Sequence, residues 1–214
     1  MVLPQESEVT HPDTAELALA KDAQDMLFRD ARTVTDFQDV PVTDAQVRAI
    51  YDLVKHGPTA MNQQPLRAVL VRSETACGRL LAHIFEDNNK AETQAAPLSV
   101  VLAADLDFHL RFAETFPVLP DAEQLYAEAE PEARIASALM NAHIQLAYFI
   151  IGVRAAGLAA APITRFDHQA LDADFFPDGK LRAVAVVNVG VPVQGMPGYP
   201  RLPRLQYEDV FLTA

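Results

Sequence analysis

The stretch PEARIASALMNAHIQLAYFIIGVRAAG, residues 131–157, is a long helical pattern around which the rest of the chain must pack. Apolar side chains occur on nearly every side of it, which is typical of a helix at the centre of a domain. Pro131 suits the first position of a helix, and Gly157 suits the position just after its end. The sequence therefore predicts a long buried core helix over residues 132–156.

Shorter segments on both sides of this helix predict a sheet and further helices. Thr43-Asp44-Ala45-Gln46 is a capping-box sequence that begins a helix, and Gly57 with Pro58 ends it. Short, apolar, β-branched runs predict buried strands over 67–72, 98–104 and 181–189, and helical patterns cover 15–30 and 74–85. We expect a single α+β domain over residues 15–214, preceded by a mobile arm over residues 1–14. Residues 114–132, acidic and rich in proline, are expected to form an excursion from the core.

The charge of the chain limits its partners. It carries 29 acidic and 17 basic residues among 214, for a formal net charge of −12. Nucleic acids and anionic membranes are bound through Lys and Arg, so neither is expected as a partner, and an anionic ligand would need a local basic pocket. The first 20 residues lack a signal-peptide pattern, and the apolar run over 146–153 is far shorter than the roughly 20 residues of a membrane-spanning helix. We therefore expect a cytoplasmic protein.

Few catalytic side chains stand out. The sequence has no Gly-x-Gly-x-x-Gly, Walker, Gly-x-Ser-x-Gly or His-Glu-x-x-His motif. Asp105, Asp107 and His109 alternate at strand spacing and could offer oxygen and nitrogen ligands to a divalent metal. A solvated strand end is the simpler interpretation, and we expect no metal. Cys77 lies in an ordinary helical pattern, which favours a buried structural thiol over a nucleophile, and His143 is interpreted as a core histidine.

Four loops place polar groups next to helices or strands: residues 31–37 (ARTVTDF), 57–65 (GPTAMNQQP), 161–167 (APITRFD) and 200–205 (PRLPRL). Each of them alone is an ordinary loop. In this order and at these separations they resemble the nitroreductase family of flavin enzymes, from about Phe28 onward. The similarity extends to the family's malonic semialdehyde reductase (3-hydroxypropanoate dehydrogenase) branch, through DART at 30–33, PVTD at 41–44, YDLVK at 51–55 and RLPRL at 201–205.

The resemblance implies a three-layer fold, with helices flanking a central, mostly antiparallel sheet, and a homodimer with FMN at each subunit interface. It also implies the residues that contact FMN. Those expected near its phosphate and ribityl chain are Arg32, Thr33, Arg201 and Arg204. Those expected along the flavin ring or its pyrimidine edge are Thr35, Pro58, Thr59, Ala60, Asn62 and Asn89. Those expected near the reactive nitrogen or the substrate are Ile163, Thr164 and Arg165.

The activity implied by the resemblance is hydride transfer through the flavin in a ping-pong cycle. NADH or NADPH is the donor, the cofactor carries the chemistry, and no catalytic side chain is needed. A small semialdehyde such as malonic semialdehyde is the favoured acceptor, with nitroaromatic or quinone reduction, or a flavin-binding protein with little turnover, as alternatives. Thr35 and Glu92 stand where relatives carry basic residues, which predicts a lower flavin potential. Arg165 replaces a frequent glycine and is suited to bind a substrate carboxylate.

Overall fold

The computed structural model describes residues 17–193 and 202–214. Within these residues four strands form one antiparallel sheet in the order β1-β2-β4-β3. The strands are β1 (Leu66–Val71), β2 (Leu98–Asp105), β3 (Ala159–Ile163) and β4 (Leu181–Gly190). The predicted mobile arm over residues 1–14 lies outside the described residues, as does Arg201.

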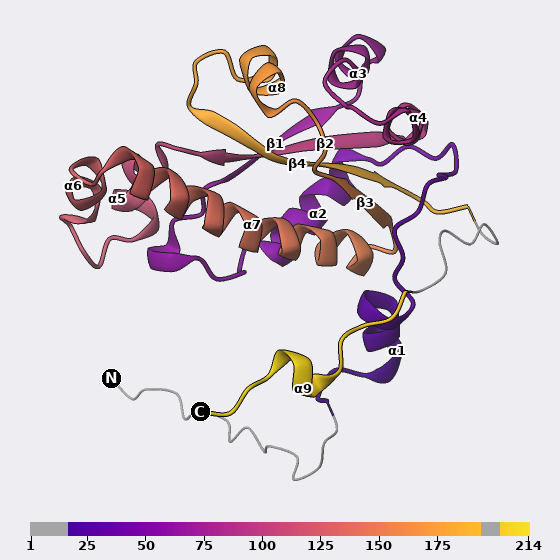
Figure 1. Cartoon of the computed structure of the whole chain (residues 1–214), viewed down its shortest axis with the longest axis horizontal. Helices are drawn as coiled ribbons and strands as arrows, with labels where there is room; N and C mark the ends of the chain where they lie inside the picture. Colours follow the sequence, from indigo (N-terminus) through magenta and orange to yellow (C-terminus); the bar gives the residue numbers. More distant parts are fainter. Residues whose placement is uncertain (1–16, 194–201) are drawn as a thin grey trace.

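Helices cover both faces of the sheet and give the predicted three-layer α+β fold (Figure 1). One face carries α3 (Glu74–Leu81), α4 (Asp87–Ala95) and α8 (His168–Phe175). The opposite face carries α2 (Asp44–Val54) and α7 (Pro131–Ala155). The remaining helices are α1 (Lys21–Gln24), η1 (Asp25–Arg29), η2 (Ala60–Asn62), η3 (Phe108–Arg111), α5 (Phe112–Thr115), α6 (Ala122–Ala127) and α9 (Tyr207–Val210).

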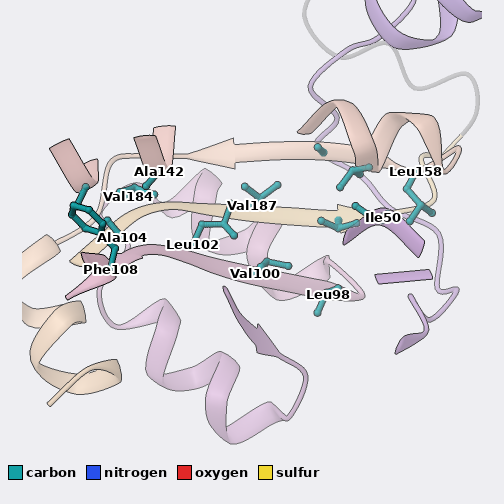
Figure 2. Packing of buried hydrophobic residues seen from close by; sticks show 14 of the residues in the cluster. Ile50, Leu98, Val100, Leu102, Ala104, Phe108, Ala142, Leu158, Val184 and Val187 are labelled. Atoms are coloured by element: carbon teal, nitrogen blue, oxygen red, sulfur yellow. The ribbon is translucent and has the colours of Figure 1, made fainter. Parts of the chain in front are cut away.

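The central strand β2 is buried on both sides because each face of the sheet is covered. Val100 and Leu102 pack with Ile50 of α2 in one hydrophobic cluster, part of which is shown in Figure 2. Val101 and Ala103 face the other way and pack in a second cluster with Leu80 of α3 and Leu171 of α8. The near-continuous apolar run that predicted this strand therefore reflects two cores.

The helix α7 has the bounds expected from its terminal residues. Pro131 is its first residue, and Gly157 follows its end with a φ of 73°. A single chain, however, buries α7 on one side only: Met140 is 68% exposed, and Ile144 and Tyr148 are also exposed. By length and composition alone α7 could cross a membrane, with a mean hydropathy of 1.4 over its most apolar window, a criterion that core helices also meet.

Several elements differ from expectation. The helix expected over 15–30 is described as α1 followed by the π-helical turn η1, and α3 ends at Leu81, before residue 85. The helices α4 and α8 and the strand β3 were not expected. The acidic excursion contains α6, whose Ala122 is fully buried, so part of it belongs to the core.

Candidate functional site

The loop after α2 has an unusual backbone. At Gly57 an added Cβ would lie 2.8 Å from Cγ of Tyr148 on α7, so this close approach requires glycine. Met61, Asn62 and Gln64 then have positive φ angles of 48°, 51° and 46°. Non-glycine residues seldom adopt this conformation, which is found where surrounding structure imposes it.

Side chains of the predicted flavin loop make contacts within the chain. The Thr59 hydroxyl accepts a hydrogen bond from the backbone N–H of Gln64 at 3.2 Å. The Asn62 side-chain amide donates to the carbonyl of Thr115 in α5 at 2.7 Å, so it links the loop to the excursion. The Ala60 amide donates to Oδ1 of Asn141 on α7 at 2.8 Å. Sequence reasoning missed Asn141, because nothing local marks which loop a helical asparagine reaches.

A cavity of about 420 Å³ opens beside this loop, lined by Tyr51, Lys55, His56, Gly57, Pro58, Thr59, Asn62 and Gln64. Tyr51, Lys55 and His56 come from the end of α2 and the residues that follow it, and sequence reasoning gave them no site role. Lys55 pairs with Asp52 at 2.7 Å. This pairing raises the pKa of the Lys55 ammonium and lowers the pKa of the Asp52 carboxyl.

A second group of predicted site residues gathers around α4. Glu86, which precedes α4, accepts a hydrogen bond from the Asn89 side chain at 3.1 Å through one carboxylate oxygen. Its other oxygen pairs with Nε of Arg165 at 2.7 Å. The turn that carries Arg165 is fixed by a β-bridge between Phe166 and Ile84. Glu86 thus joins two predicted site residues, and sequence reasoning missed it.

The segment after η1 reaches the same helix. The Thr35 hydroxyl donates to the Asp36 carboxylate at 2.8 Å. Burial raises the pKa of the Glu92 carboxyl on α4, and the nearby charge of Asp36 raises it further. Glu92 lies one helical turn from Asn89, so the structure brings the Thr35 segment, Glu92 and Asn89 to one side of α4.

Close packing holds this segment against the sheet. Phe37 forms a β-bridge with Pro192, and a Cβ added at Gly190 would lie 2.8 Å from the Phe37 ring and 2.6 Å from Pro97. Glycine at position 190 therefore lets the segment lie against the end of β4. Just before this packed stretch, Arg32 and Thr33 are exposed.

The two groups lie at different positions along α7. The loop after α2 bonds to Asn141, whereas the carbonyl of Leu27, shortly before Arg32, accepts from Arg154 in the last turn of the helix at 3.2 Å. Thirteen residues of helix separate these contacts, or about 20 Å at 1.5 Å per residue. Figure 1 shows the same separation, with the purple loop near α5 and with α1 and α4 toward the other end. One chain therefore does not bring all the predicted residues together.

Of the two arginines predicted in the carboxy-terminal tail, Arg204 lies among the described residues. Arg204 is exposed, and its guanidinium donates to the carbonyls of Leu202 at 2.8 Å and Pro203 at 3.2 Å. At the other predicted stretch, Ile163 is buried at the end of β3 and Thr164 is exposed after it.

The remaining candidates are placed as follows. β2 ends at Asp105, whose carboxylate pairs with Arg67 at 2.5 Å. His109 lies buried in η3, so Asp105, Asp107 and His109 do not alternate along one strand. No group of three or more His, Cys, Asp or Glu that could hold a metal ion occurs in the described part of the chain. Cys77 is half-buried, and burial raises the pKa of its thiol. The interpretation of His143 as a core residue was wrong: it is exposed, with Nδ1 2.6 Å from the Leu139 carbonyl.

The chain is similar to known proteins over most of its length. The profile described as "Nitroreductase family" matches residues 28–191. A Streptomyces coelicolor protein with the provisional name NADH dehydrogenase/NAD(P)H nitroreductase is 50% identical over 197 residues, which cover 92% of this chain and 98% of that one. A Streptomyces griseus protein of the same provisional name is 49% identical over 197 residues, with the same coverage. A solved Exiguobacterium sibiricum structure, provisionally named a nitroreductase in complex with FMN, has a TM-score of 0.78 at 17% identity and covers 91% of this chain and 98% of its own.

Proposed function

This chain belongs to the nitroreductase family, and from that premise we propose that it is an FMN-dependent NAD(P)H oxidoreductase. The observation that carries the proposal is the family match over residues 28–191, supported by relatives provisionally named as NAD(P)H nitroreductases. Bound FMN would supply the redox chemistry, taking a hydride from NADH or NADPH and passing it to a second substrate. The task of this chain's residues is to bind and orient.

The donor groups that the structure exposes fit an anionic flavin nucleotide. In a chain with a net charge of −12, the phosphate needs a local cation, and Arg32 is exposed beside the Thr33 hydroxyl. Asn89 offers an amide for the pyrimidine edge, and the Glu86 carboxylate holds that amide in place. Thr164 and Arg165 would lie at the reactive side of the ring. We propose that Arg204, with Arg201, joins Arg32 at the phosphate when FMN binds.

We further propose that two copies complete each site. The loop carrying Pro58, Thr59, Ala60 and Asn62 lies about 20 Å along α7 from the segment leading to Arg32, so it would serve the flavin of a second copy. Exposed apolar side chains supply a surface for that copy. They include Met140, Ile144, Tyr148, Tyr51, Leu53, Tyr207, Val210, Phe211 and Leu212. On this proposal a second copy, and not lipid, covers α7, and the enzyme works in the cytoplasm, where NADH and NADPH are found.

For the second substrate we propose a small semialdehyde with a carboxylate, such as malonic semialdehyde. The support is Arg165, whose side chain is 77% exposed and pairs with Glu86 through Nε. A guanidinium binds a carboxylate through two parallel hydrogen bonds. Nitroaromatic or quinone reduction is the second candidate, favoured by the names of the relatives.

One absorbance experiment tests the proposed activity. The purified protein, incubated with FMN and then desalted, should show the flavin bands, and NADH or NADPH should bleach them under anaerobic conditions. A colourless protein that retains no FMN would overturn the proposal. A yellow protein that neither donor bleaches would instead be a flavin-binding protein with little turnover.

A comparison of substrates tests the proposed role of Arg165. In the Arg165→Gly variant kcat/KM for malonic semialdehyde should fall about tenfold or more, because a charge-assisted contact is lost, while kcat/KM for a neutral quinone should stay within about twofold. An Arg165→Lys variant keeps the charge but loses the bidentate contact. Its kcat/KM for malonic semialdehyde should therefore lie between the values for the wild type and Arg165→Gly. An equal loss for both substrates would contradict this role.

A further inference from the structure

Two buried amide side chains, Gln63 and Asn141, are joined behind the loop after α2. Gln63 is 1% exposed and Asn141 is 2% exposed. Nδ2 of Asn141 donates to Oε1 of Gln63 at 3.0 Å and to the carbonyl of Ser137 at 2.9 Å. Nε2 of Gln63 lies 2.9 Å from the Tyr126 hydroxyl and 3.0 Å from the Ser137 hydroxyl. Both amides are therefore satisfied on their donor and acceptor ends.

This pairing fixes the direction of the Asn141 amide. Its Oδ1 must face the Ala60 N–H, because its Nδ2 already donates to Gln63 and Ser137. A reversed amide would place an N–H group against the Ala60 N–H and would leave Oε1 of Gln63 without this donor. A side chain without both a donor and an acceptor would break the pattern at either position.

The loop needs such an external hold. Met61, Asn62 and Gln64 each have left-handed φ, which costs a non-glycine residue free energy that neighbouring contacts must offset. Asn141 contacts the loop on both sides of Met61 and Asn62. Its Oδ1 accepts from the Ala60 N–H before them, and its Nδ2 donates to the Gln63 side chain after them. The buried pair thus anchors the strained turn where it enters and where it continues.

We propose that Asn141 and Gln63 are positioning residues that hold the Thr59–Asn62 turn in the shape that receives the flavin ring. The proposal rests on the proposed function, since it concerns the same site. The pair acts through the loop backbone: the Ala60 N–H is drawn back toward α7, and the outer surface of Thr59 and Asn62 is left facing the cavity beside α2. Through the Tyr126 hydroxyl the pair also ties the turn to α6.

The decisive variant is Asn141→Ala, which removes the acceptor for Ala60 and the donor to Gln63. Gln145→Ala is a matched control, because Gln145 lies one turn further along α7 and its Oε1 accepts the backbone N–H of Leu66 at 2.9 Å, beyond the turn. The measurements are the dissociation constant for FMN, by titration of the folded apoprotein, and the visible absorption and circular dichroism of bound FMN. Thermal melting shows how much each variant is destabilised.

Asn141→Ala should weaken FMN binding about tenfold or more and shift the visible circular dichroism of the flavin. Gln145→Ala should melt earlier but bind FMN within about twofold of wild type and leave its spectrum unchanged. Asn141→Asp adds a second test: a protonated carboxyl keeps the acceptor for Ala60 and one of the two donors of the amide, whereas the carboxylate has no donor, so the FMN affinity of this variant should increase as pH falls.

Two outcomes separate this inference from the proposed function. If the wild-type protein binds no FMN, the proposed function is wrong. If the wild type binds FMN and Asn141→Ala, folded by circular dichroism, binds it equally well with the same spectrum, the positioning role is wrong while the proposed function stands.

Discussion

His109 is a buried titratable residue outside the proposed site. It is 5% exposed in η3, and its Nδ1 has no hydrogen-bond partner among the described residues. Burial lowers its pKa, and the neighbouring charge of Arg134 lowers it further. The carboxylates of Asp107, Glu123 and Asp105 act in the opposite direction but do not outweigh burial. The folded protein therefore favours neutral His109.

This predicts a loss of stability in acid. The unfolded chain takes up the proton near the ordinary His pKa of 6.5, before the folded protein does, so the free energy of unfolding should fall as pH drops below about 6.5. The fall from this residue should stop below the folded pKa. Urea unfolding at about pH 7.5 and about pH 5.5 measures it, and His109→Gln should lose less stability between the two. Equal losses would contradict this assignment.

Glu92 is the residue whose charge bears most directly on the proposed cofactor. It lies on the side of α4 that carries Asn89, and its carboxyl has a raised pKa caused by burial and then by Asp36. Glu92→Lys should remove the repulsion between the Glu92 and Asp36 carboxylates and place a cation near reduced flavin. The two-electron potential of bound FMN should rise by about 30 mV or more, equivalent to about 1.4 kcal/mol.

The potential of bound FMN is measured by equilibration with a reference dye. Glu132→Lys makes the same charge change at the exposed start of α7 and serves as the control. An equal rise in both variants would show that net charge, and not the position of Glu92, sets the potential.

At the scale of elements, the packing of α2 on α7 depends on a missing side chain. A Cβ at Gly152 of α7 would overlap Cγ1 of Val54 and lie 3.1 Å from Cγ2 of Ile50, both on α2. Gly152→Ala should therefore lower the free energy of unfolding by about 2 kcal/mol through overpacking. Chemical denaturation checks this value.

Gly78 provides the control for that substitution. It also lies inside a helix, α3, but a Cβ there meets nothing within 4 Å. Gly78→Ala should stabilise the protein by about 0.5–1 kcal/mol, because alanine loses less conformational freedom in a helix. If Gly78→Ala lowered the free energy of unfolding as well, overlap with α2 would not explain the effect of Gly152→Ala.

Elements with strong local signals could be predicted from the sequence. The capping box at α2 is present as expected, with Gln46 N donating to Thr43 Oγ1 at 3.2 Å and Gln46 Oε1 accepting from Thr43 N at 2.9 Å. The helix α4 (DNNKAETQA) was missed because alanines are its only apolar residues and no periodicity marks a buried face. The strand β3 was missed because Pro162 suggests a loop, although an edge strand tolerates proline.

The candidate site was predictable only in part, because some of its residues have no local signal in the sequence. The family resemblance, and not a local sequence pattern, pointed to Asn89 and Arg165. Glu86, Gln63 and Asn141 act through tertiary contacts, and the partner of a buried amide or carboxylate cannot be read from local sequence.

At the scale of the whole molecule, the apolar face of α7 should control assembly. Met140 is 68% exposed in a single chain, and burial of a methionine side chain in an interface contributes about 1.5–3 kcal/mol. Met140→Glu replaces that contact with a charge, so light scattering after gel filtration should show a monomer. If two copies complete each site, as we propose, the same variant should lose FMN on desalting.

Gln169→Glu is the control for assembly, because it adds the same charge at an exposed position of α8 on the opposite face of the sheet. It should remain a dimer and keep its flavin. A wild-type monomer that retains FMN would contradict the two-copy site.

The order of the strands in the sheet also governs how the chain is made. β2 pairs with β4, and α7 and β3 lie between them in the sequence. On the ribosome β2 therefore emerges several seconds before the strand that completes its pairing. Throughout that interval Val100 and Val101, both fully buried in the finished protein, lack their strand partners Val187 and Val186. A chaperone that meets the nascent chain in this interval would find β2 paired at most with β1, with its β4 edge still open.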